Sequence, residues 1–301
     1  MQFDAHCMEC LVRRQLNLAL KYGDGKTMDA YMREVMQTIL TAPKGVSAPW
    51  LAGAFAGIFQ RYWPGEDAYA KLKQDSNDLV MDMLPRLREA VDMAQDPLEM
   101  ALRYACVGNF LDFGILAPET ARQELDKSLE GEPDELADMA VWAKMRGELM
   151  GAKEVLILGD NAGEIVFDML LVEQLKKHDP ALTVTYCVRG GNVQNDATRQ
   201  DATYCGMDKI CAMVDSGANI SGTELDYIGD ELKAAIKRAD VIIAKGSGNF
   251  ESMAGCGLNV YYVFMCKCRR IAKLMKVPLM SAMLLRERDA VIADPYVGRL
   301  D

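Results

Sequence analysis

A short polar turn containing Asp160 and Asn161 is the stretch of this sequence that most clearly suggests chemistry. It follows four apolar residues, 155–158, which are typical of a strand buried on both faces of a parallel sheet. Glu164 then opens a pattern with helical spacing. Carboxylate and amide oxygens side by side at the end of a strand suit a hard divalent cation. The structural alternative is that Asp160 or Asn161 only caps the following helix.

Two further polar loops follow apolar segments later in the chain. One begins at Arg189 and contains Asp196, and the other begins with a lysine beside two near-adjacent glycines. Such a lysine can place an ammonium group and backbone N–H groups around a phosphate. Each loop also has a structural explanation, since Asp196 could cap the next helix and glycines could only make turns. We expect these loops to bind phosphate or substrate through Arg189, Asn195, Lys245, Gly246, Asn249 and Glu251.

Alternating apolar and helical segments predict how these loops are positioned. Strands are predicted at residues 155–158, 182–188, 209–214, 241–244, 259–265 and 290–293, with helical patterns between most of them. This alternation is typical of a three-layer α/β/α fold with a doubly wound, mainly parallel sheet. Because parallel strands end at one edge of a sheet, the polar loops should converge there. That edge would offer three oxygen ligands for a metal, Asp160, Asn161 and Asp196.

Residues 1–150 contain only helical patterns. Apolar residues recur at helical spacing, and the pair Asp96-Pro97 is a typical helix start. Pro85 lies within a long polar helical pattern and should kink or split that helix. The sequence therefore predicts an all-helical lobe at residues 1–150 and a Rossmann-like α/β domain at residues 151–301 that carries the metal and phosphate site.

The composition argues against several classes of function. The formal net charge of −10 is opposite in sign to that of a general nucleic-acid-binding surface. No apolar run is long enough to span a bilayer, and the N-terminus lacks the pattern of a secretory signal, so we expect a cytoplasmic protein without membrane partners. Two histidines argue against a Ser-His-Asp triad and a His-rich zinc site. The sequence does not indicate an oligomeric state.

Nine cysteines are expected to be reduced thiols, because their number is odd and the chain is too large to need a disulfide framework. Cys7 and Cys10 form a C-x-x-C pair, a spacing that occurs in metal sites and redox-active pairs. The pair lies before a helix in an all-helical region, whereas a redox pair is expected near a βαβ unit. Packing near the domain interface is therefore the favoured interpretation, and a metal or redox site is the alternative.

These motifs together resemble those of the damage-control phosphatases, also called the domain-of-unknown-function 89 or ARMT-like family. The resemblance rests on residues 159–168, 189–202 and 245–251, and the segment 4–10 resembles the opening of the stand-alone prokaryotic branch. It implies a metal-dependent phosphomonoesterase with a helical lobe on an α/β/α core. By match to the motifs, the metal ligands would be Asp160, Asn161 and Asp196, and the phosphate contact would be Lys245.

The resulting hypothesis is hydrolysis of a small phosphate ester, either a sugar phosphate or a damaged cofactor phosphate, with Mg²⁺, Mn²⁺, Co²⁺ or Ni²⁺ as the cofactor. Asp160 and Lys245 would be catalytic, and the sequence leaves open whether Asp160 attacks phosphorus or only holds the metal. One alternative is an S-adenosylmethionine-dependent carboxyl methyltransferase, although Asp160 would repel the cofactor carboxylate. Another is a non-catalytic sensor of sugar phosphates or nucleotides, which would bind without turnover.

Overall fold

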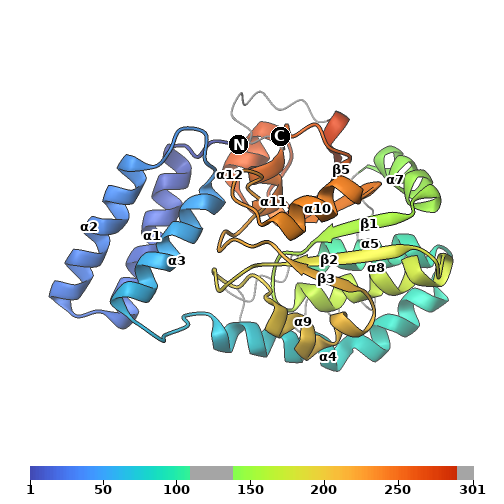
Figure 1. Ribbon diagram of the computed structural model, residues 1–301, viewed down its shortest axis with the longest axis horizontal. Helices are drawn as coiled ribbons and strands as arrows, with labels where there is room; N and C mark the ends of the chain where they lie inside the picture. The colour runs from blue at the N-terminus through green and yellow to red at the C-terminus, as the bar shows by residue number, and fades with distance from the viewer. Residues whose placement is uncertain (109–137, 290–301) are drawn as a thin grey trace.

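The computed structural model describes residues 1–108 and 138–289, and a six-stranded sheet lies at its centre (Figure 1). The sheet order is β3-β2-β1-β4-β5-β6, in which β1 to β5 are parallel and β6 is antiparallel to β5. The predicted α/β class with a mainly parallel sheet is therefore confirmed. The strands are β1 (Glu154–Leu158), β2 (Thr183–Val188), β3 (Ala212–Asp215), β4 (Val241–Lys245), β5 (Val260–Met265) and β6 (Ala282–Arg286).

Helices precede the sheet in sequence and connect its strands. Several begin where a side chain accepts backbone N–H groups of the first turn, as Asp4 and Ser47 do. Pro85 lies inside one continuous helix, so of the predicted kink or split the split does not occur, and the kink stays a prediction. The helices are α1 (Ala5–Tyr22), α2 (Gly25–Thr41), α3 (Ala48–Tyr62), α4 (Ala70–Met93), α5 (Pro97–Gly108), α7 (Met139–Gly151), α8 (Glu164–His178), α9 (Arg199–Cys205), α10 (Asp230–Arg238), α11 (Gly246–Met253) and α12 (Arg269–Met275).

The sheet lies between two layers of helices because the side chains of each strand alternate between its faces. On one face, Val155 and Ile157 of β1 pack with α4, α5, α7 and α8. On the other face, Leu156 and Leu158 pack with α10, α11 and α12. This arrangement gives the three layers that the alternation of strands and helices predicted.

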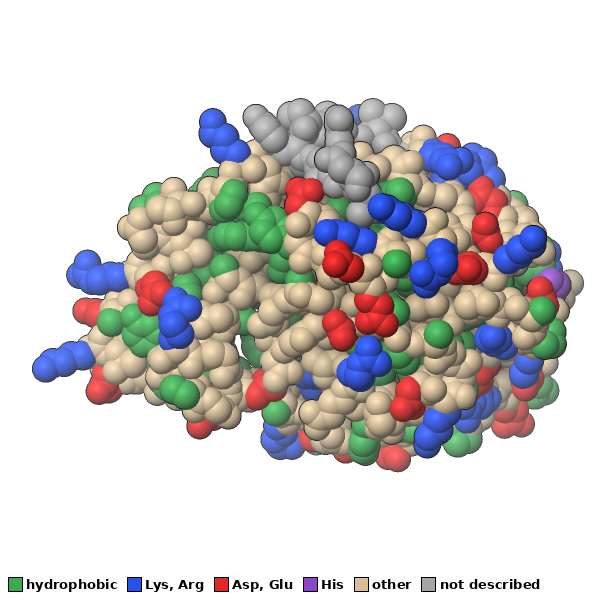
Figure 2. Space-filling model, viewed as in Figure 1, with side chains coloured by type: hydrophobic (Ala, Val, Ile, Leu, Met, Phe, Trp, Pro, Cys, Tyr) green, Lys and Arg blue, Asp and Glu red, His purple; other side chains and the backbone are tan. Residues whose placement is uncertain are grey.

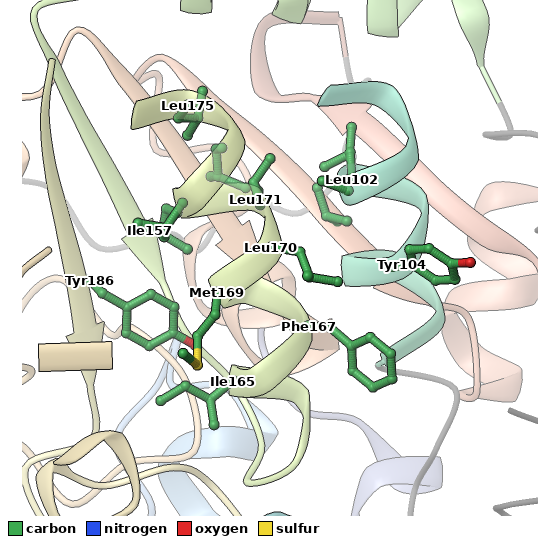
Figure 3. Packing of buried hydrophobic residues seen from close by; sticks show 14 of the residues in the cluster. Leu102, Tyr104, Ile157, Ile165, Phe167, Met169, Leu170, Leu171, Leu175 and Tyr186 are labelled. Carbon is green, nitrogen blue, oxygen red and sulfur yellow. The ribbon is translucent and has the colours of Figure 1, made fainter. Parts of the chain in front are cut away.

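Helix α8 packs closely against α5 in the helical layer that covers Val155 and Ile157 of β1 (Figure 3). Phe167 and Leu170 of α8 point toward α5, whereas Met169 lies beside Tyr186 of β2. All four side chains are buried. Helix α8 is therefore enclosed on several sides, and polar groups on it need partners within the protein.

Helices α1–α3 form a bundle with an apolar core of its own, at the left in Figure 1. Val193, from the loop after β2, belongs to this core, and Asn192 donates a hydrogen bond to Asp67 over 3.0 Å. The bundle therefore contacts a loop at the carboxyl edge of the sheet. Helices α4, α5 and α7 instead share the core of the sheet. The division into two domains at residue 150 stays a prediction.

The two outermost strands of the sheet, β3 and β6, were predicted less well than the others. The strand expected at residues 209–214 begins only at Ala212, because residues 207–209 form a 3₁₀ turn. The strand expected at residues 290–293 lies outside the described residues, and β6 was not predicted. The sequence signal for β6 is weak because only Met283 and Leu284 are buried in this edge strand.

The surface of the described chain carries charges of both signs. On the face shown in Figure 2, acidic and basic side chains are interspersed between polar and apolar surface. None of the helices within the described residues combines the length and the apolar character needed to cross a bilayer. The expected absence of nucleic-acid and membrane partners stays a prediction.

Candidate active site

The carboxyl ends of β1 and β4 meet at the point where the strand order of the sheet reverses. In open α/β sheets, ligands bind in the crevice outside the strands at such a point. The loop after β1 carries Asp160 and Asn161. Asn161 pairs with Asp196 in an isolated antiparallel bridge, and the N–H of Ala197 donates to the carbonyl of Asp160 over 2.7 Å. Gly246, after β4, lies against the carboxylate of Asp160. The three polar loops therefore converge as predicted.

Arg189 connects the two predicted carboxylate ligands and is almost completely buried. Its Nε donates to Asp196 Oδ2 over 2.6 Å, and a terminal nitrogen lies 3.7 Å from Asp160 Oδ1. Its other contacts are the carbonyl of Gly222 and Asn249 Oδ1. Burial acts to lower the pKa of Arg189, but Asp196 and Asp160 raise it above the ordinary value. Arg189 thus fixes both carboxylates, and the substrate contact predicted for it stays a prediction.

The ammonium group of Lys245 is fully buried and donates three hydrogen bonds. Its acceptors are Glu164 Oε1 at 2.6 Å, Asp168 Oδ1 at 2.7 Å and the carbonyl of Ala105 at 2.7 Å. Burial alone would lower the pKa of Lys245, but Asp168 and Glu164 hold it above the ordinary value. Since a lysine has three donors, a phosphate contact requires the exchange of one of these acceptors. The predicted contact with phosphate stays a prediction.

Asn249 joins the ends of β1 and β4. Its Nδ2 donates to the carbonyls of Leu158, Gly159 and Lys245 over 3.2, 3.1 and 2.7 Å. Its Oδ1 accepts a hydrogen bond from Thr223 Oγ1 over 2.8 Å, in addition to the bond from the guanidinium described above. The side chain is fully buried, and its hydrogen bonds connect the backbone at the ends of the two strands beneath the site. Its predicted substrate contact stays a prediction.

The contacts of Asn195 and Glu251, two further predicted substrate residues, are also within the protein. The carbonyl of Asn195 accepts from the N–H of Ala162 over 2.9 Å and so links two of the loops. Glu251 lies among other charges, and its surroundings include Arg270 and Arg14. Burial raises the pKa of Glu251 to about 7, against the opposing effect of Arg270. For both residues, a substrate contact stays a prediction.

Glu164 and Asp168, which the sequence analysis did not assign, complete the site. Both are buried in the first two turns of α8. Asn161 Nδ2 donates to Asp160 Oδ2 over 2.8 Å and to Glu164 Oε2 over 3.3 Å. Tyr186 donates its hydroxyl to Asp168 Oδ2 over 2.8 Å. A signal was present, because two acidic residues four positions apart lie on one face of a helix that is otherwise apolar there.

Lys267 is a third residue that the sequence analysis did not assign. It follows β5 by two residues, is half-buried, and acts to lower the pKa of Asp160. It therefore brings a positive charge to the same edge of the sheet. In the sequence Lys267 stands between Cys266 and Cys268, outside the three polar loops from which the site was predicted.

The site contains more buried negative than positive charge. Four buried carboxyl groups face two buried cations, Arg189 and Lys245, and the half-buried Lys267 is a third cation at this edge, so acidic groups outnumber basic ones by one. Burial, Glu164 and Asp196 together raise the pKa of Asp160 well above its ordinary value. This donor set fits a divalent ion that is held by one or two carboxylates and completes its shell with water and phosphate oxygens. Within residues 1–108 and 138–289, no three His, Cys, Asp or Glu side chains form a metal-binding group by themselves.

The C-x-x-C pair shows no sign of a reactive thiol. Cys7 is buried on α1, and burial raises its pKa to about 12. Arg270 donates to its Sγ over 3.7 Å, and Cys10 is half-buried. A thiol with a raised pKa is a poor nucleophile and a poor metal ligand. These contacts agree with packing, while a metal or redox role for Cys7 and Cys10 stays a prediction.

Comparison with known proteins identifies the family. Residues 3–283 match the damage-control phosphatase ARMT1-like domain. The chain belongs to this family. The resemblance inferred from the sequence motifs is thereby confirmed, and the match includes both the α1–α3 bundle and the five parallel strands of the sheet.

Three proteins are similar to this member of the damage-control phosphatase family over most of its length. An uncharacterized protein of Methanocaldococcus jannaschii is 27% identical over 291 residues, covering 93% of this chain and 94% of that protein. A damage-control phosphatase of Archaeoglobus fulgidus is 31% identical over 210 residues, with coverages of 69% and 72%. One of Pyrococcus horikoshii is 27% identical over 243 residues, with coverages of 80% and 82%. The crystal structure of a DUF89 family protein from Pyrococcus horikoshii has the same fold, with a TM-score of 0.81 at 24% identity over 95% of this chain and 99% of that chain.

Proposed function

We propose that this protein is a metal-dependent phosphatase that hydrolyses small phosphorylated metabolites. Two relatives named damage-control phosphatases support the reaction type. The observation that carries the proposal is the excess of buried carboxylate at the carboxyl edge of β1, where Asp160 and Asp196 are held by one guanidinium. The substrates that we propose are sugar phosphates or phosphate esters of damaged cofactors, hydrolysed in the cytoplasm.

Asp160, Asn161 and Asp196 would hold a divalent ion, for which we propose Mg²⁺, Mn²⁺, Co²⁺ or Ni²⁺. When bound, such an ion polarises phosphoryl oxygens and offsets charge that develops during hydrolysis. Other side chains of the protein orient the proposed ligands. Asp196 accepts from Arg189 through one oxygen and from Ser221 Oγ, at 2.9 Å, through the other. Its carboxylate therefore has a fixed orientation before any ligand arrives.

The phosphate would be held by positive charge at the same edge. We propose Lys267 for this contact, because this half-buried residue brings a positive charge to Asp160 from the loop after β5. The N-terminus of α11, with its partial positive charge, begins at Gly246 beside Asp160. In this arrangement Lys245 neutralises Glu164 and Asp168 and keeps both carboxylates in place. We propose that it affects turnover through that role.

Release of phosphate from p-nitrophenyl phosphate tests the proposal. Protein dialysed against EDTA should be inactive, and Mg²⁺, Mn²⁺, Co²⁺ or Ni²⁺ should restore release better than Ca²⁺, since octahedral sites that retain water favour smaller ions. Asp160→Asn serves as the negative control. Full activity of the dialysed protein would contradict the metal dependence. Binding of phosphate esters without release, across a metabolite panel and every ion, would instead indicate a sensor.

A further inference from the structure

We propose that Asn77 is a positioning residue that couples the two loops bearing the predicted metal ligands. It lies on α4, outside all three sequence motifs of the site, and its side chain contacts the ends of both loops. The inference rests on the proposed function, because it concerns the geometry of the same ligands. Its physical basis is a pair of buried hydrogen bonds made by one amide group.

The amide of Asn77 is 1% exposed and bonds in two directions. Its Oδ1 accepts a hydrogen bond from the N–H of Gly163 over 2.7 Å, and its Nδ2 donates to Asp201 Oδ1 over 3.1 Å. Gly163 ends the loop after β1, two residues beyond Asn161. Asp201 lies in the first turn of α9, which directly follows the loop with Asp196.

The contact with Gly163 positions the start of α8. Gly163 is the N-cap of this helix and has a φ of +77°, so the chain turns sharply at this residue. An N-cap residue has no intrahelical acceptor for its N–H, and leaving a buried N–H unpaired costs about 1–3 kcal/mol. Asn77 supplies that acceptor. The bond therefore holds the turn between Asn161 and Glu164.

The contact with Asp201 reaches a carboxylate that other groups already hold. Thr198 donates to its Oδ2 through N–H and Oγ1, over 2.8 and 2.7 Å, and Lys73 Nζ lies 2.7 Å from the same oxygen. Burial acts to raise the pKa of Asp201, but Lys73 and Thr198 lower it below the ordinary value. The carboxylate of Asp201 is thus held in one position. Asn77 connects this carboxylate to the loop after β1.

The two loops also bond to each other through their backbones, between Ala162 and Asn195 and between Ala197 and Asp160. Those bonds set the register of the loops. The side chain of Asn77 adds a connection between them through helix α4. Small divalent ions such as Mg²⁺ bind best when their oxygen ligands are held in octahedral positions. Loss of the Asn77 hydrogen bonds should therefore weaken ion binding, because the distance between the carboxylates of Asp160 and Asp196 would vary more. Partners that orient metal ligands typically change affinity or activity about 10- to 100-fold when removed.

Asn77→Leu tests this coupling, with Ser76→Ala as the matched control. Ser76 is also buried on α4, and its hydroxyl bonds only within the helix, to the carbonyl of Leu72 over 2.6 Å, among the described residues. For each variant, Mn²⁺ affinity is measured by calorimetric titration, and hydrogen–deuterium exchange is measured for residues 160–163 and 195–198. We expect Asn77→Leu to weaken Mn²⁺ binding about 10- to 100-fold and to speed exchange in both loops. Ser76→Ala should change neither.

Asn77→Asp provides a second test, because it keeps an acceptor for Gly163 but places a carboxylate against Asp201. Exchange should then accelerate mainly at residues 195–198. If Asn77→Leu does not fold, Asn77→Asp alone tests whether Asn77 couples the two loops. Unchanged Mn²⁺ affinity and unchanged exchange in the folded variants, with only a lower melting temperature, would overturn the proposal. A wild-type protein that binds no Mn²⁺ would contradict the proposed function instead, and the exchange data would still test the coupling.

Discussion

Gly246 lies so close to Asp160 that no side chain fits between them. A Cβ built on Gly246 would be 1.9 Å from Asp160 Oδ2, and the φ of Gly246 is +76°, where residues with a Cβ are strained. Two separate constraints therefore require glycine at the junction of β4 and α11. One of them is the backbone conformation, and the other is the position of a carboxylate at the centre of the site.

Gly246→Ala should therefore reduce activity far more than backbone strain alone would. Gly65 offers a matched control, since its φ is +81° and nothing lies within 4 Å of the point that a Cβ on it would occupy. Both variants should be destabilised by about 1–2 kcal/mol from the left-handed conformation. Only Gly246→Ala should also displace Asp160 and lose phosphatase activity and Mn²⁺ binding. Equal phosphatase activity of the two variants would contradict the close approach of Gly246 to the Asp160 carboxylate.

Asp160→Asn should separate folding from metal binding. Burial raises the pKa of the Asp160 carboxyl group, and the charges of Glu164 and Asp196 raise it further, so a neutral amide at this position removes both the cost of burying a charge and the repulsion. We expect the metal-free variant to melt at the wild-type temperature or above it, and to lose both turnover and any rise in melting temperature with Mn²⁺. Thermal melts with and without Mn²⁺ measure this. Asp208→Asn, an exposed site, should respond to Mn²⁺ as wild type does.

Lys245→Met should be strongly destabilising. It leaves Glu164 and Asp168 buried without their cation, and breaking such a pair typically costs about 3–5 kcal/mol. Lys144→Met is the control, because its ion pair with Asp289 is solvent-exposed and should contribute little to stability. Urea unfolding measures both. A Lys245→Met protein of wild-type stability would show that the two carboxylates are not held by this ammonium group.

Lys267→Ala should lower turnover by about two to three powers of ten, the scale expected for loss of one donor to a developing charge. Stability should change little, because the side chain is only half-buried. Steady-state hydrolysis of p-nitrophenyl phosphate with Mn²⁺ measures the effect, and Mn²⁺ affinity should not fall. Lys273→Ala on α12 controls for loss of a surface charge. Unchanged turnover would exclude Lys267 as the phosphate contact.

Glu251 should make stability depend on pH. Burial raises its pKa from 4.5 to about 7, so the folded protein binds this proton more tightly than the unfolded chain does. Its stabilising contribution is complete below pH 4.5 and is lost as the pH rises through 7, by a total of about 3 kcal/mol. Urea unfolding between pH 5 and 8 should show this loss in wild type and in the exposed control Glu231→Gln. A Glu251→Gln variant that retains the full slope would contradict this assignment.

Several features could be predicted from the sequence because they depend on local patterns. Four apolar residues before Asp160 require a strand buried on both faces, and parallel strands require their polar loops to share one edge. The position of Asp160, Asn161 and Asp196 around one point follows from those two rules. Strand β6 escaped prediction for the same reason, since its pattern of burial is too short to stand out.

The tertiary structure alone decided what each charged group contacts. Lys245, whose predicted phosphate contact stays a prediction, donates to acceptors on α5 and α8 that lie 140, 81 and 77 residues away in the chain. Asn77 gave no signal of its own, since its partners lie 86 and 124 residues away. A buried charge or amide must find partners in the folded protein, and those partners are set by the packing of helices on the sheet. Sequence spacing within a motif does not contain that information.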